Sequence, residues 1–492
     1  MKRTVAAPDY VLALDEGTTN AKALAIAPDG TVLASGSAPV PVSHPRPGWV
    51  EQDAEAIWQA QARAIAACLD GVGGATPAGI AISNQRESVV AWDAGDGRPL
   101  GPVLGWQDSR TAEFCDWLRS PEREFAVSAT TGLSLDPMFS APKMRYLLDM
   151  VDAAPAGAFR ARIGTIDSWL VARLTGQESY VIEAGNASRT LLLDLATTSW
   201  SEEMCALFGV DAARLPRVVR SDAHFGTTRA LGLLPDGIPV VGVLGDSHAA
   251  LFGHGCRSSR QAKATYGTGS SVMVPTGANR EVRPGVATTL AWLTETPMYG
   301  REGNIVASGA AMDWVARLLG AGGGKGLDAL AADAASSEGV HLVPAFTGLG
   351  APWWDRRATG LITGVTAGTT PAHLARAALE AVAHQVADVV EAMTAGPAGS
   401  DLEVLHADGG ASSSRLLMQI QADLLGREVL VSANAEVSAL GAALMGFARL
   451  GWELPDPAAD PAVVYRPQVT APLRQAARAQ WGRAIARSRF RP

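Results

Sequence analysis

The chain has 492 residues, a formal net charge of −8 and 47% hydrophobic residues. This length exceeds what one hydrophobic core usually organises, so we expect two or three domains. The acidic balance is spread along the chain and argues against a nucleic-acid binder, because such proteins carry a basic face. There is no uninterrupted apolar run of about 18 residues, so we expect no membrane span.

The cysteines and the start of the chain bear on the compartment. The four cysteines lie far apart and form no C-x-x-C pair, which argues against a disulfide framework or a zinc site. Residues 1–10 carry two basic side chains but no apolar stretch after them, so a signal peptide is not expected. These features predict a protein of the reducing cytoplasm.

The first part of the chain predicts an antiparallel meander followed by alternating helix and strand. Apolar side chains recur at helical spacing over residues 53–69, and Asp53 is suited to cap that helix. Gly17 marks the first turn. The strands expected here are 10–15, 21–26, 31–35, 79–83 and 89–92. Such an order of elements predicts an α/β domain.

The second half repeats this opening. A predicted strand at 262–265 runs into the turn Gly267-Thr268-Gly269 and returns over 271–274. The two Gly-Thr turns lie about half the chain apart, and such internal repetition indicates a duplicated architecture. We place the boundary near residues 253–255, which gives domains 1–254 and 255–492. Further expected elements are a flexible loop at 320–326, helices at 371–393, 413–425 and 438–450, a strand at 402–407, and a mixed-charge helix after Arg466.

The two Gly-Thr turns are candidates for binding phosphate. Such a turn exposes backbone N–H groups and a hydroxyl, with no Cβ at the glycine to block approach. Lys22 could add a point charge beside the first turn. Either turn alone is equally consistent with an ordinary hairpin. The pair, together with a strand running into Asp408-Gly409-Gly410, favours a nucleotide site.

Charged residues at the ends of predicted strands suggest how a phosphoryl group is handled. Asp15 and Asp246 each end a buried strand, where a carboxylate could hold Mg²⁺ or orient an attacking hydroxyl. Asp246 is also suited to cap the helix that follows it. Arg86 and Glu87 could donate to and accept from the hydroxyls of a polyol. The alternative for these two is a surface charge pair.

Other motifs are weaker. Residues 322–325 (Gly-Gly-Gly-Lys) lack the spacing and the Ser/Thr of a P-loop, and no G-x-G-x-x-G follows a strand. The eight histidines show no zinc spacing. His248 could reach a substrate or serve packing. Trp353 and Trp354 could stack on a ligand, although loop packing is the commoner role for such a pair.

At this point the ordered motifs resemble the FGGY carbohydrate kinases, and within them the glycerol kinases. The resemblance covers essentially the whole chain. The stretches that carry it include residues 14–19, 47–51, 84–87, 186–190, 266–269, 344–352, 360–365, 408–410 and 438–443.

The resemblance implies an α/β fold of two ribonuclease-H-like domains of the actin/hexokinase type, with an interdomain cleft. It implies ATP and Mg²⁺, with Asp246 as the general base and with Asp15 and Asp246 near the metal. ATP would be bound by Thr18, Thr19, Asn20, Lys22, Gly267, Thr268, Gly309, Asp313, Gly410 and Ser414. The acceptor would contact Arg86, Glu87, Trp106, Met138, Asp246, Ser247 and Ser271.

Three residues depart from the glycerol kinase pattern. Met138 stands where a glycerol kinase has Tyr, Ser247 where it has Gln, and Ser271 where it has Phe. A lost hydrogen bond costs about 1 kcal/mol, so these changes alter which acceptor is preferred. We predict a four-carbon or longer polyol, or a ketose, rather than strict use of glycerol. Residues 231–236 lack the Arg of the loop that binds a sugar bisphosphate inhibitor, so such inhibition is not expected.

The predicted function is transfer of the γ-phosphoryl group of ATP to a hydroxyl of a small polyol or sugar. The alternative is a nucleotide-dependent binding protein of the actin/chaperone type, which would share the two turns but would not need Arg86, Glu87 and Asp246 in one pocket. An inactive homologue is a third reading, opposed by the presence of Asp15, Asp246 and both turns. We expect no nucleic-acid or membrane partner, and a homodimer or homotetramer are the candidate assemblies.

Overall fold

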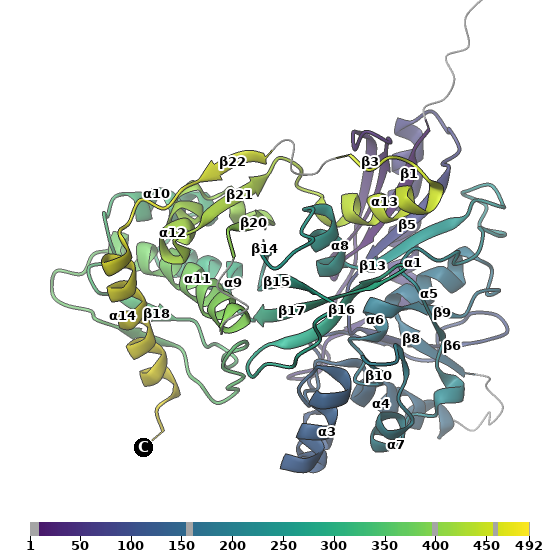
Figure 1. The fold of residues 1–492 in the computed structure, drawn as a ribbon, viewed down its shortest axis with the longest axis horizontal. Coiled ribbons are helices and arrows are strands. Elements are labelled where there is room, and N and C mark those ends of the chain that lie inside the picture. Colours follow the sequence, from purple (N-terminus) through teal and green to yellow (C-terminus); the bar gives the residue numbers. More distant parts are fainter. Residues whose placement is uncertain (1–8, 154–160, 396–401, 456–460, 492) are drawn as a thin grey trace, which may run out of the picture.

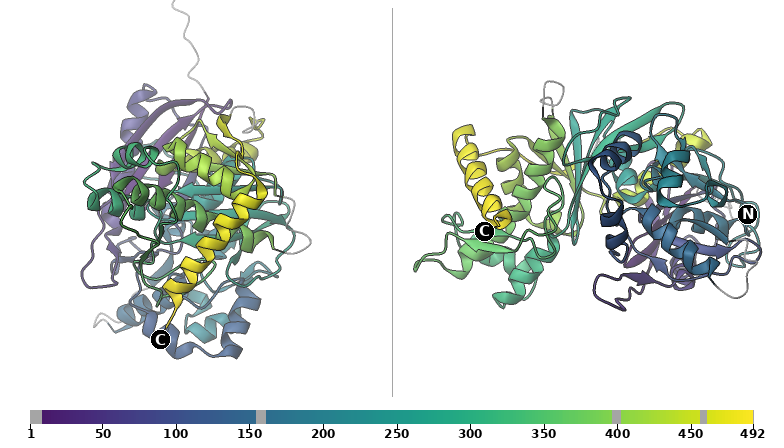
Figure 2. Two further views of the ribbon diagram at one scale, coloured as in Figure 1. Left: turned by 90° about the vertical axis from the view of Figure 1, so that its left-hand side faces the viewer. Right: turned by 90° about the horizontal axis from the view of Figure 1, so that it is seen from below.

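The computed structural model describes residues 9–153, 161–395, 402–455 and 461–491. Two lobes lie side by side, each built on a sheet with helices packed against it (Figures 1 and 2). The first sheet contains β1 (Val11–Glu16), β2 (Asn20–Ile26), β3 (Val32–Pro39), β5 (Gly79–Asn84) and β13 (Val240–Gly245). The second contains β14 (Gln261–Tyr266), β15 (Ser270–Gly277), β16 (Ala287–Leu293), β17 (Pro297–Ile305), β20 (Val404–Asp408), β21 (Glu428–Ser432) and β22 (Pro461–Tyr465).

The two sheets share one connectivity. In the first, the order is β13-β5-β1-β2-β3, with β1, β2 and β3 antiparallel and with β5 and β13 added in parallel. In the second, β17-β15-β14-β20-β21 repeats that pattern, and β16 and β22 extend the two edges. This repetition confirms the predicted fold class of two ribonuclease-H-like units, and it places the two Gly-Thr turns at equivalent hairpins.

Helices flank both sheets. In the first half they are α1 (Ala54–Gly71), α2 (Ala112–Leu118), α3 (Pro121–Thr131), α4 (Ser140–Asp152), α5 (Ile166–Leu174), α6 (Ala184–Ala187), α7 (Glu202–Phe208) and α8 (Asp246–Gly253). In the second they are α9 (Gly309–Leu318), α10 (Gly324–Ala332), α11 (Pro371–Thr394), α12 (Arg415–Leu425), α13 (Val437–Leu450) and α14 (Ala471–Arg489). None of the helices within the described ranges is long and apolar enough to cross a bilayer.

Smaller strands complete the first lobe and the outer edge of the second. A four-stranded sheet has the order β4 (Glu51–Gln52), β7 (Val103–Leu104), β6 (Val89–Asp93) and β8 (Ala161–Thr165). The remaining pairs are β9 (Val181–Glu183) with β12 (Arg217–Val219), β10 (Leu193–Asp194) with β11 (Ser199–Trp200), and β18 (His341–Val343) with β19 (Leu361–Thr363). Asp53 caps α1 as predicted, since its side chain accepts from the backbone N–H groups of Glu55 and Ala56.

Helix α13 lies far from its sequence neighbours and joins the two halves. It packs against β1, β5 and β13 of the first sheet and against α8, and Figure 1 shows it beside those strands. The approach to α8 is close because glycines face it: a Cβ on Gly441 would lie 1.8 Å from the carbonyl oxygen of Ala249. A Cβ on Gly253 would likewise lie 2.5 Å from the carbonyl oxygen of Val437. Helix α8, which begins at Asp246, is therefore clamped by the C-terminal half.

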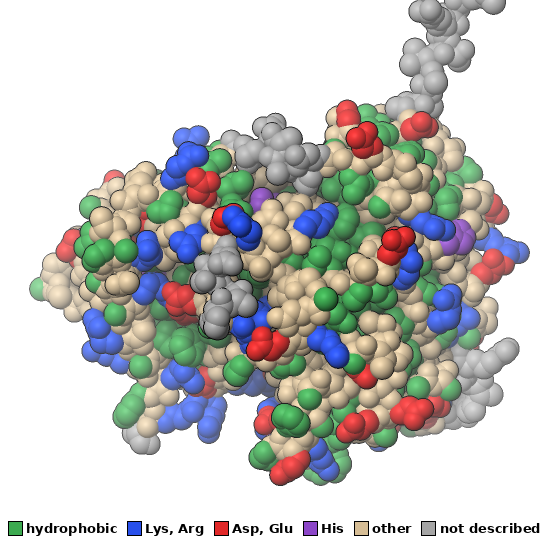
Figure 3. Space-filling view, viewed as in Figure 1, with side chains coloured by type: hydrophobic (Ala, Val, Ile, Leu, Met, Phe, Trp, Pro, Cys, Tyr) green, Lys and Arg blue, Asp and Glu red, His purple; other side chains and the backbone are tan. Residues whose placement is uncertain are grey.

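Three predicted elements are wrong in detail. The helix expected from 413 is preceded by a 3₁₀ turn, Gly410–Ser413, and α12 begins only at Arg415 because the Ser414 side chain caps it by accepting from the backbone N–H of Leu417. The loop expected at 320–326 already enters α10 at Gly324. The terminal helix is basic and not of mixed charge, since α14 carries five arginines and no acidic residue. Lys and Arg side chains accordingly gather over the left-hand lobe, which contains α14 (Figure 3).

The glycine contact between α8 and α13 predicts a stability cost. Gly441→Ala should lower the free energy of unfolding by about 1–3 kcal/mol, because the added methyl group overlaps a backbone oxygen that cannot move freely. Gly482→Ala in α14 is the matched control, since no atom lies within 4 Å of its added Cβ. That control should be neutral or stabilising by up to about 1 kcal/mol, as expected for Gly→Ala in an exposed helix. Urea unfolding of both variants measures the difference, and equal stabilities would refute the proposed clamp.

Candidate functional site

The first Gly-Thr turn joins β1 to β2. The backbone N–H of Gly17 donates to the carbonyl oxygen of Asn20 at 3.0 Å, which closes the turn. Thr18 is held from the side: its hydroxyl accepts from Nε1 of Trp106 at 3.0 Å, and its carbonyl accepts from Nε2 of Gln52 at 2.8 Å. Thr19 is exposed. Trp106, expected at the acceptor, therefore also supports the turn expected at the phosphates.

Lys22 follows the first turn on β2 and reaches the other half of the chain. Its Nζ lies 2.5 Å from Oε2 of Glu436, the residue before α13. Both side chains are about one-third exposed, so solvent screens the pair and its contribution to stability is small. The contact links the first turn to the helix that clamps α8.

The second turn is packed from two sides. The backbone N–H of Gly267 donates to the carbonyl oxygen of Gly269 at 2.9 Å, and the carbonyl of Gly267 accepts from the backbone N–H of Gly309 at 3.0 Å. The carbonyl of Thr268 accepts from the first turn of α9 at the same distance. A Cβ on Gly309 would lie 2.6 Å from the oxygen of Gly267, and one on Gly409 would lie 2.6 Å from the oxygen of Tyr266. Only glycine permits this approach.

The residues expected at adenosine border this second turn. Gly309 starts α9, and Gly410 follows the turn after β20 with open space around its Cα. Asp313 lies one turn further along α9 and is exposed. The Ser414 hydroxyl donates to Oδ1 of Asp328 at 2.8 Å, so Asp328 on α10 is a neighbour that the sequence did not indicate.

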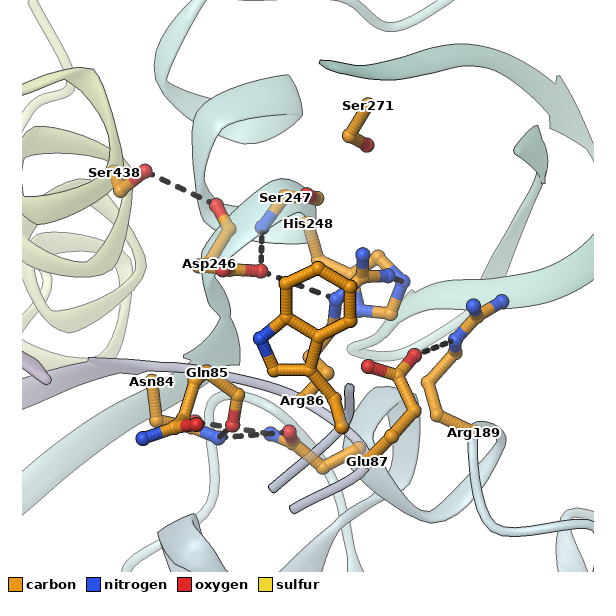
Figure 4. Close-up of polar contacts among 12 residues, drawn as sticks. Asn84, Gln85, Arg86, Glu87, Arg189, Asp246, Ser247, His248, Ser271 and Ser438 are labelled. Carbon is orange, nitrogen blue, oxygen red and sulfur yellow. Dashed lines mark hydrogen bonds and ion pairs between the residues drawn. The ribbon is translucent and has the colours of Figure 1, made fainter. Parts of the chain in front are cut away.

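Arg86 orients the proposed base. Its Nε donates to Oδ1 of Asp246 at 3.1 Å, and the backbone N–H of Ser247 donates to the same oxygen at 2.5 Å (Figure 4). The Asp246 side chain is 43% exposed while Arg86 is buried. The hydroxyl of Ser438 on α13 donates to the Asp246 carbonyl at 3.1 Å. Asp246 thus presents an accessible carboxylate on a rigidly held backbone, which suits a group that must accept a proton.

Glu302 on β17 is the central residue that the sequence reasoning missed. Its two carboxylate oxygens accept from Nη1 and Nη2 of Arg86 at 2.8 and 2.5 Å, and Oε2 lies 3.0 Å from Nη1 of Arg189. Burial alone would raise the pKa of Glu302, but Arg189 and Arg86 hold it well below its ordinary value. The sequence offered no signal for it, because β17 was not predicted as a strand and Glu302 stands beside Arg301 in a segment that also contains Gly and Asn.

Glu87 completes this network with a strained backbone. Its φ of 63° lies in the left-handed region, which non-glycine residues rarely adopt. Oε1 of Glu87 accepts from Nε of Arg189 at 2.6 Å, and the Glu87 carbonyl accepts from the Ser140 hydroxyl at 3.1 Å. Arg86 and Glu87 are each 5% exposed, so the alternative of a surface charge pair is wrong. Strain of this kind is concentrated at functional sites.

Met138 is held by a buried lysine. Nζ of Lys143 donates to the Met138 carbonyl at 2.6 Å and to the Gly105 carbonyl at 3.1 Å. Burial lowers the pKa of Lys143 to about 8, although nearby Glu87 acts to raise it. The Met138 side chain is half-buried. The segment that carries Met138 is therefore fixed beside the Glu87 network.

Ser271 belongs to a group of hydrogen-bonded polar side chains on β14, β15 and β17, next to the second turn. Its hydroxyl donates to Oε1 of Glu302 at 3.2 Å and lies 3.3 Å from Nζ of Lys263, which also donates to the hydroxyl of Thr265 at 3.2 Å. Lys263 is completely buried, and burial lowers its pKa while Asp408 and Glu302 act to raise it. The Ser271 hydroxyl therefore connects Glu302, the partner of Arg86, to Lys263, which lies next to the second turn.

The surroundings of Asp15 and Asp246 suit a Mg²⁺ ion. Burial raises the pKa of Asp15 to about 6, and the charges of Asp246 and Glu436 raise it further against the effects of Ser83 and Lys22. A cation there would relieve this accumulation of negative charge. No group of three or more His, Cys, Asp or Glu residues in the described part of the chain is arranged to hold a metal. Mg²⁺ commonly takes one or two carboxylates plus substrate phosphates and water, so these two aspartates fit it.

The side chains of His248 and of the Trp353-Trp354 pair have partners within the protein. His248 is buried, with Nε2 3.3 Å from Nη1 of Arg86 and 3.4 Å from the Thr289 hydroxyl. Burial, and next the Arg86 charge, lower its pKa well below the ordinary value. Nε1 of Trp354 donates to the Gly285 carbonyl at 2.8 Å, and Trp353 packs with it against the core of the second lobe.

Comparison with known proteins decides the family. Residues 10–253 match the N-terminal domain of the FGGY family of carbohydrate kinases, and residues 262–450 match its C-terminal domain. The chain belongs to the FGGY family of carbohydrate kinases. It is therefore an ATP-dependent phosphotransferase that acts on a hydroxyl group of a sugar or polyol, as predicted. The actin- or chaperone-like alternative has no support from these findings.

Relatives of this FGGY kinase are named for different substrates. The chain is 43% identical over 490 residues to an apulose kinase from Pectobacterium atrosepticum, covering 98% of this chain and 99% of that protein. It is 45% identical over 444 residues to a glycerol kinase from Geobacter sp. (strain M21), covering 89% of each. Among solved structures, Plasmodium falciparum glycerol kinase with ADP superposes with a TM-score of 0.90 at 27% identity, over 99% of each chain.

The Glu302 network predicts a large stability effect. Glu302→Gln should lower the free energy of unfolding at pH 7 by about 3 kcal/mol, because it removes the charge shared by two buried arginines. The depressed pKa of Glu302 stabilises the fold above the ordinary glutamate pKa, and this contribution is lost as the pH falls through the folded-state value. The difference in the free energy of unfolding between wild type and variant should therefore decrease below about pH 4.3.

A matched control separates this effect from loss of any carboxylate. Glu281 also faces an arginine, Arg301, at 3.3 Å, but its side chain is 59% exposed. Glu281→Gln should change stability by less than about 1 kcal/mol. Denaturant titrations at pH 7 and at pH 4 provide the comparison. Equal effects at residues 302 and 281 would contradict the central role of the Glu302 carboxylate.

Proposed function

We propose that this FGGY kinase transfers the γ-phosphoryl group of ATP to a hydroxyl of a polyol or ketose larger than glycerol. The observation that carries the proposal is the position of Ser271. Its short side chain is hydrogen-bonded to Glu302 and Lys263. Ser247 and the half-buried Met138 are the other two departures from the glycerol kinase pattern. The short polar side chains of Ser247 and Ser271 favour an acceptor with an additional hydroxyl-bearing carbon.

Asp246 accepts the proton of the attacking hydroxyl in the proposed reaction. Arg86 and the Ser247 backbone hold its Oδ1 in place, so the carboxylate needs no reorientation during transfer. The turns at Gly17-Thr18 and Gly267-Thr268 would bind phosphate oxygens through backbone N–H groups other than those of Gly17 and Gly267, which close the turns. Preorganised donors of this kind stabilise the charge that develops in phosphoryl transfer.

Asp15 and Asp246 would hold Mg²⁺, which when bound neutralises phosphate charge. Gly309, Asp313, Gly410 and Ser414 would line the adenosine site next to the second turn. Placement of the reaction in the cytoplasm is supported by the four cysteines, all of which are free and buried.

The relatives support a sugar or polyol acceptor without choosing between them. The apulose kinase and glycerol kinases match this chain at 41–45% identity, so overall similarity does not separate the two substrates. The name apulose denotes a ketose, which lies within the class that the short side chains of Ser247 and Ser271 favour. The acceptor pocket, and not the fold, therefore carries the substrate proposal.

The acceptor prediction is tested by a coupled ADP-release screen. We expect a ketose such as apulose, or a tetritol or pentitol, to give at least about tenfold higher kcat/KM than glycerol, since one well-placed polar contact is worth that factor. Dihydroxyacetone serves as a three-carbon ketose control that separates length from the keto group. If glycerol has by far the highest kcat/KM, the interpretation of Met138, Ser247 and Ser271 is wrong.

The role of Asp246 is tested by Asp246→Asn. This variant keeps the side-chain volume and an oxygen for Arg86 but cannot accept a proton, so kcat should fall by about 10²–10⁴-fold. Binding of ADP without Mg²⁺, measured by calorimetry, should change little because Gly309, Asp313, Gly410 and Ser414 are untouched. Asp236→Asn, in an exposed loop, is the control and should retain full turnover. Normal turnover in Asp246→Asn would exclude this aspartate as the base.

A further inference from the structure

His254 and Asp408 form a buried pair between the two halves of the chain. Nε2 of His254 lies 2.6 Å from Oδ2 of Asp408, and the two residues are 5% and 7% exposed. His254 is the C-terminal cap residue of α8, and Asp408 is the last residue of β20. They are separated by 154 positions in the sequence, so the contact exists only because of the tertiary fold.

Each partner stands next to a different part of the proposed reaction. Helix α8 begins with Asp246 and ends with His254, and one eight-residue helix of about 12 Å connects the base to the pair. Asp408 directly precedes Gly409 and Gly410, which enter the proposed adenosine site. A short helix transmits displacement as a rigid body, so a movement at one end reaches the other.

The pair is also joined to the acceptor side through charge. Burial acts to raise the pKa of Asp408, but the hydrogen bond and charge of His254, then Lys263, hold it below its ordinary value. Lys263 contacts the Ser271 hydroxyl, which donates to Glu302, the partner of Arg86. Polar groups therefore extend from Asp408 to Arg86, the residue that orients Asp246, by a charge interaction with Lys263 and then by hydrogen bonds through the half-buried Ser271 and Glu302.

We propose that the His254–Asp408 pair is a positioning link that aligns the helix carrying Asp246 with the loop that binds the nucleotide. Binding of ATP at Gly410 would then set the base, and an ordered base would favour nucleotide binding, because such coupling is reciprocal. The proposal depends on the proposed function only in taking Asp246 as the base and residues 409–410 as nucleotide contacts. The link assists catalysis through other residues and does not touch the reacting atoms.

The test compares His254→Ala with a conservative variant in the full-length protein. In His254→Ala, we expect the dissociation constant of Mg-ADP to rise about tenfold, the factor that one lost charge-assisted hydrogen bond produces. We also expect a larger fraction of ATP to be hydrolysed without transfer, because the base is no longer aligned with the nucleotide. In His254→Gln, which keeps a donor in reach of Asp408, the constant should stay within about threefold of wild type.

His406→Ala is the matched control. His406 is a neighbouring buried imidazole, with its ring centre 5.3 Å from that of His254, and it precedes Asp408 by two positions on β20. Its removal should lower thermal stability by a similar amount but leave Mg-ADP affinity unchanged. If His406→Ala weakens Mg-ADP as much as His254→Ala does, the effect is one of packing and the link is refuted.

A second variant keeps the test decisive if His254→Ala does not fold. Asp408→Asn preserves volume and removes the charge, and it should weaken Mg-ADP in the same direction as His254→Ala. Unchanged Mg-ADP affinity in Asp408→Asn, with no rise in uncoupled hydrolysis, would overturn the proposal. Calorimetry with Mg-ADP needs no acceptor, so failure to find a phosphorylated polyol or ketose would count against the proposed function and not against the link.

Discussion

The structure depends on one buried ionic contact, the carboxylate of Glu302 held between the guanidinium groups of Arg86 and Arg189. Glu302 belongs to the second half of the chain and both arginines to the first. Without Glu302 the two buried arginines would keep only Asp246 and Glu87 as ionic partners, so this contact favours the observed arrangement of the two halves. The same contact fixes the Arg86 side chain, and Arg86 in turn holds Asp246. Cohesion of the two lobes and orientation of the proposed base therefore have a common origin.

The duplicated architecture has been adapted differently in its two copies. Both phosphate turns close an antiparallel hairpin at the same place in their sheets. The first is supported by side chains, since Trp106 holds the Thr18 hydroxyl, whereas the second is supported by the backbone of α9. Helix α13 crosses back to the first sheet and meets α8 through glycine contacts. The lobes are thus interlocked around Asp246, although their sheets are separate.

The acceptor side shows how one small residue can have two effects. Ser271 is smaller than the Phe of the glycerol kinase pattern, and its hydroxyl also connects Glu302 to Lys263. An acceptor hydroxyl near this position would compete with or join an existing hydrogen-bond network instead of entering an apolar gap. Since buried polar networks favour partners that satisfy them completely, the proposed acceptor preference would follow from hydrogen bonding as much as from volume.

The sequence by itself determined the elements and the class of chemistry. Periodicity and turn residues located β1, β2, α1, β14, β15 and α11 to within a few residues, because hydrophobic pattern and glycine turns act locally. The repeated Gly-Thr turns and the ordered motifs indicated the FGGY family, and its comparison with known proteins confirmed that. Local signals failed where a cap or a charge pattern depended on detail, as at residues 410–415 and in α14.

Only the tertiary structure decided which residues act together. Glu302, Lys263 and His254 lie outside the motifs that the sequence analysis singled out, and Glu302 and His254 have partners that are distant along the chain. A charged side chain in a predicted strand can be anticipated to need a partner, but the identity of that partner depends on how the two sheets are placed. Hydrophobic pattern specifies each sheet locally, whereas the pairing of buried charges is a property of the packed lobes, where desolvation makes an unpaired charge too costly to keep.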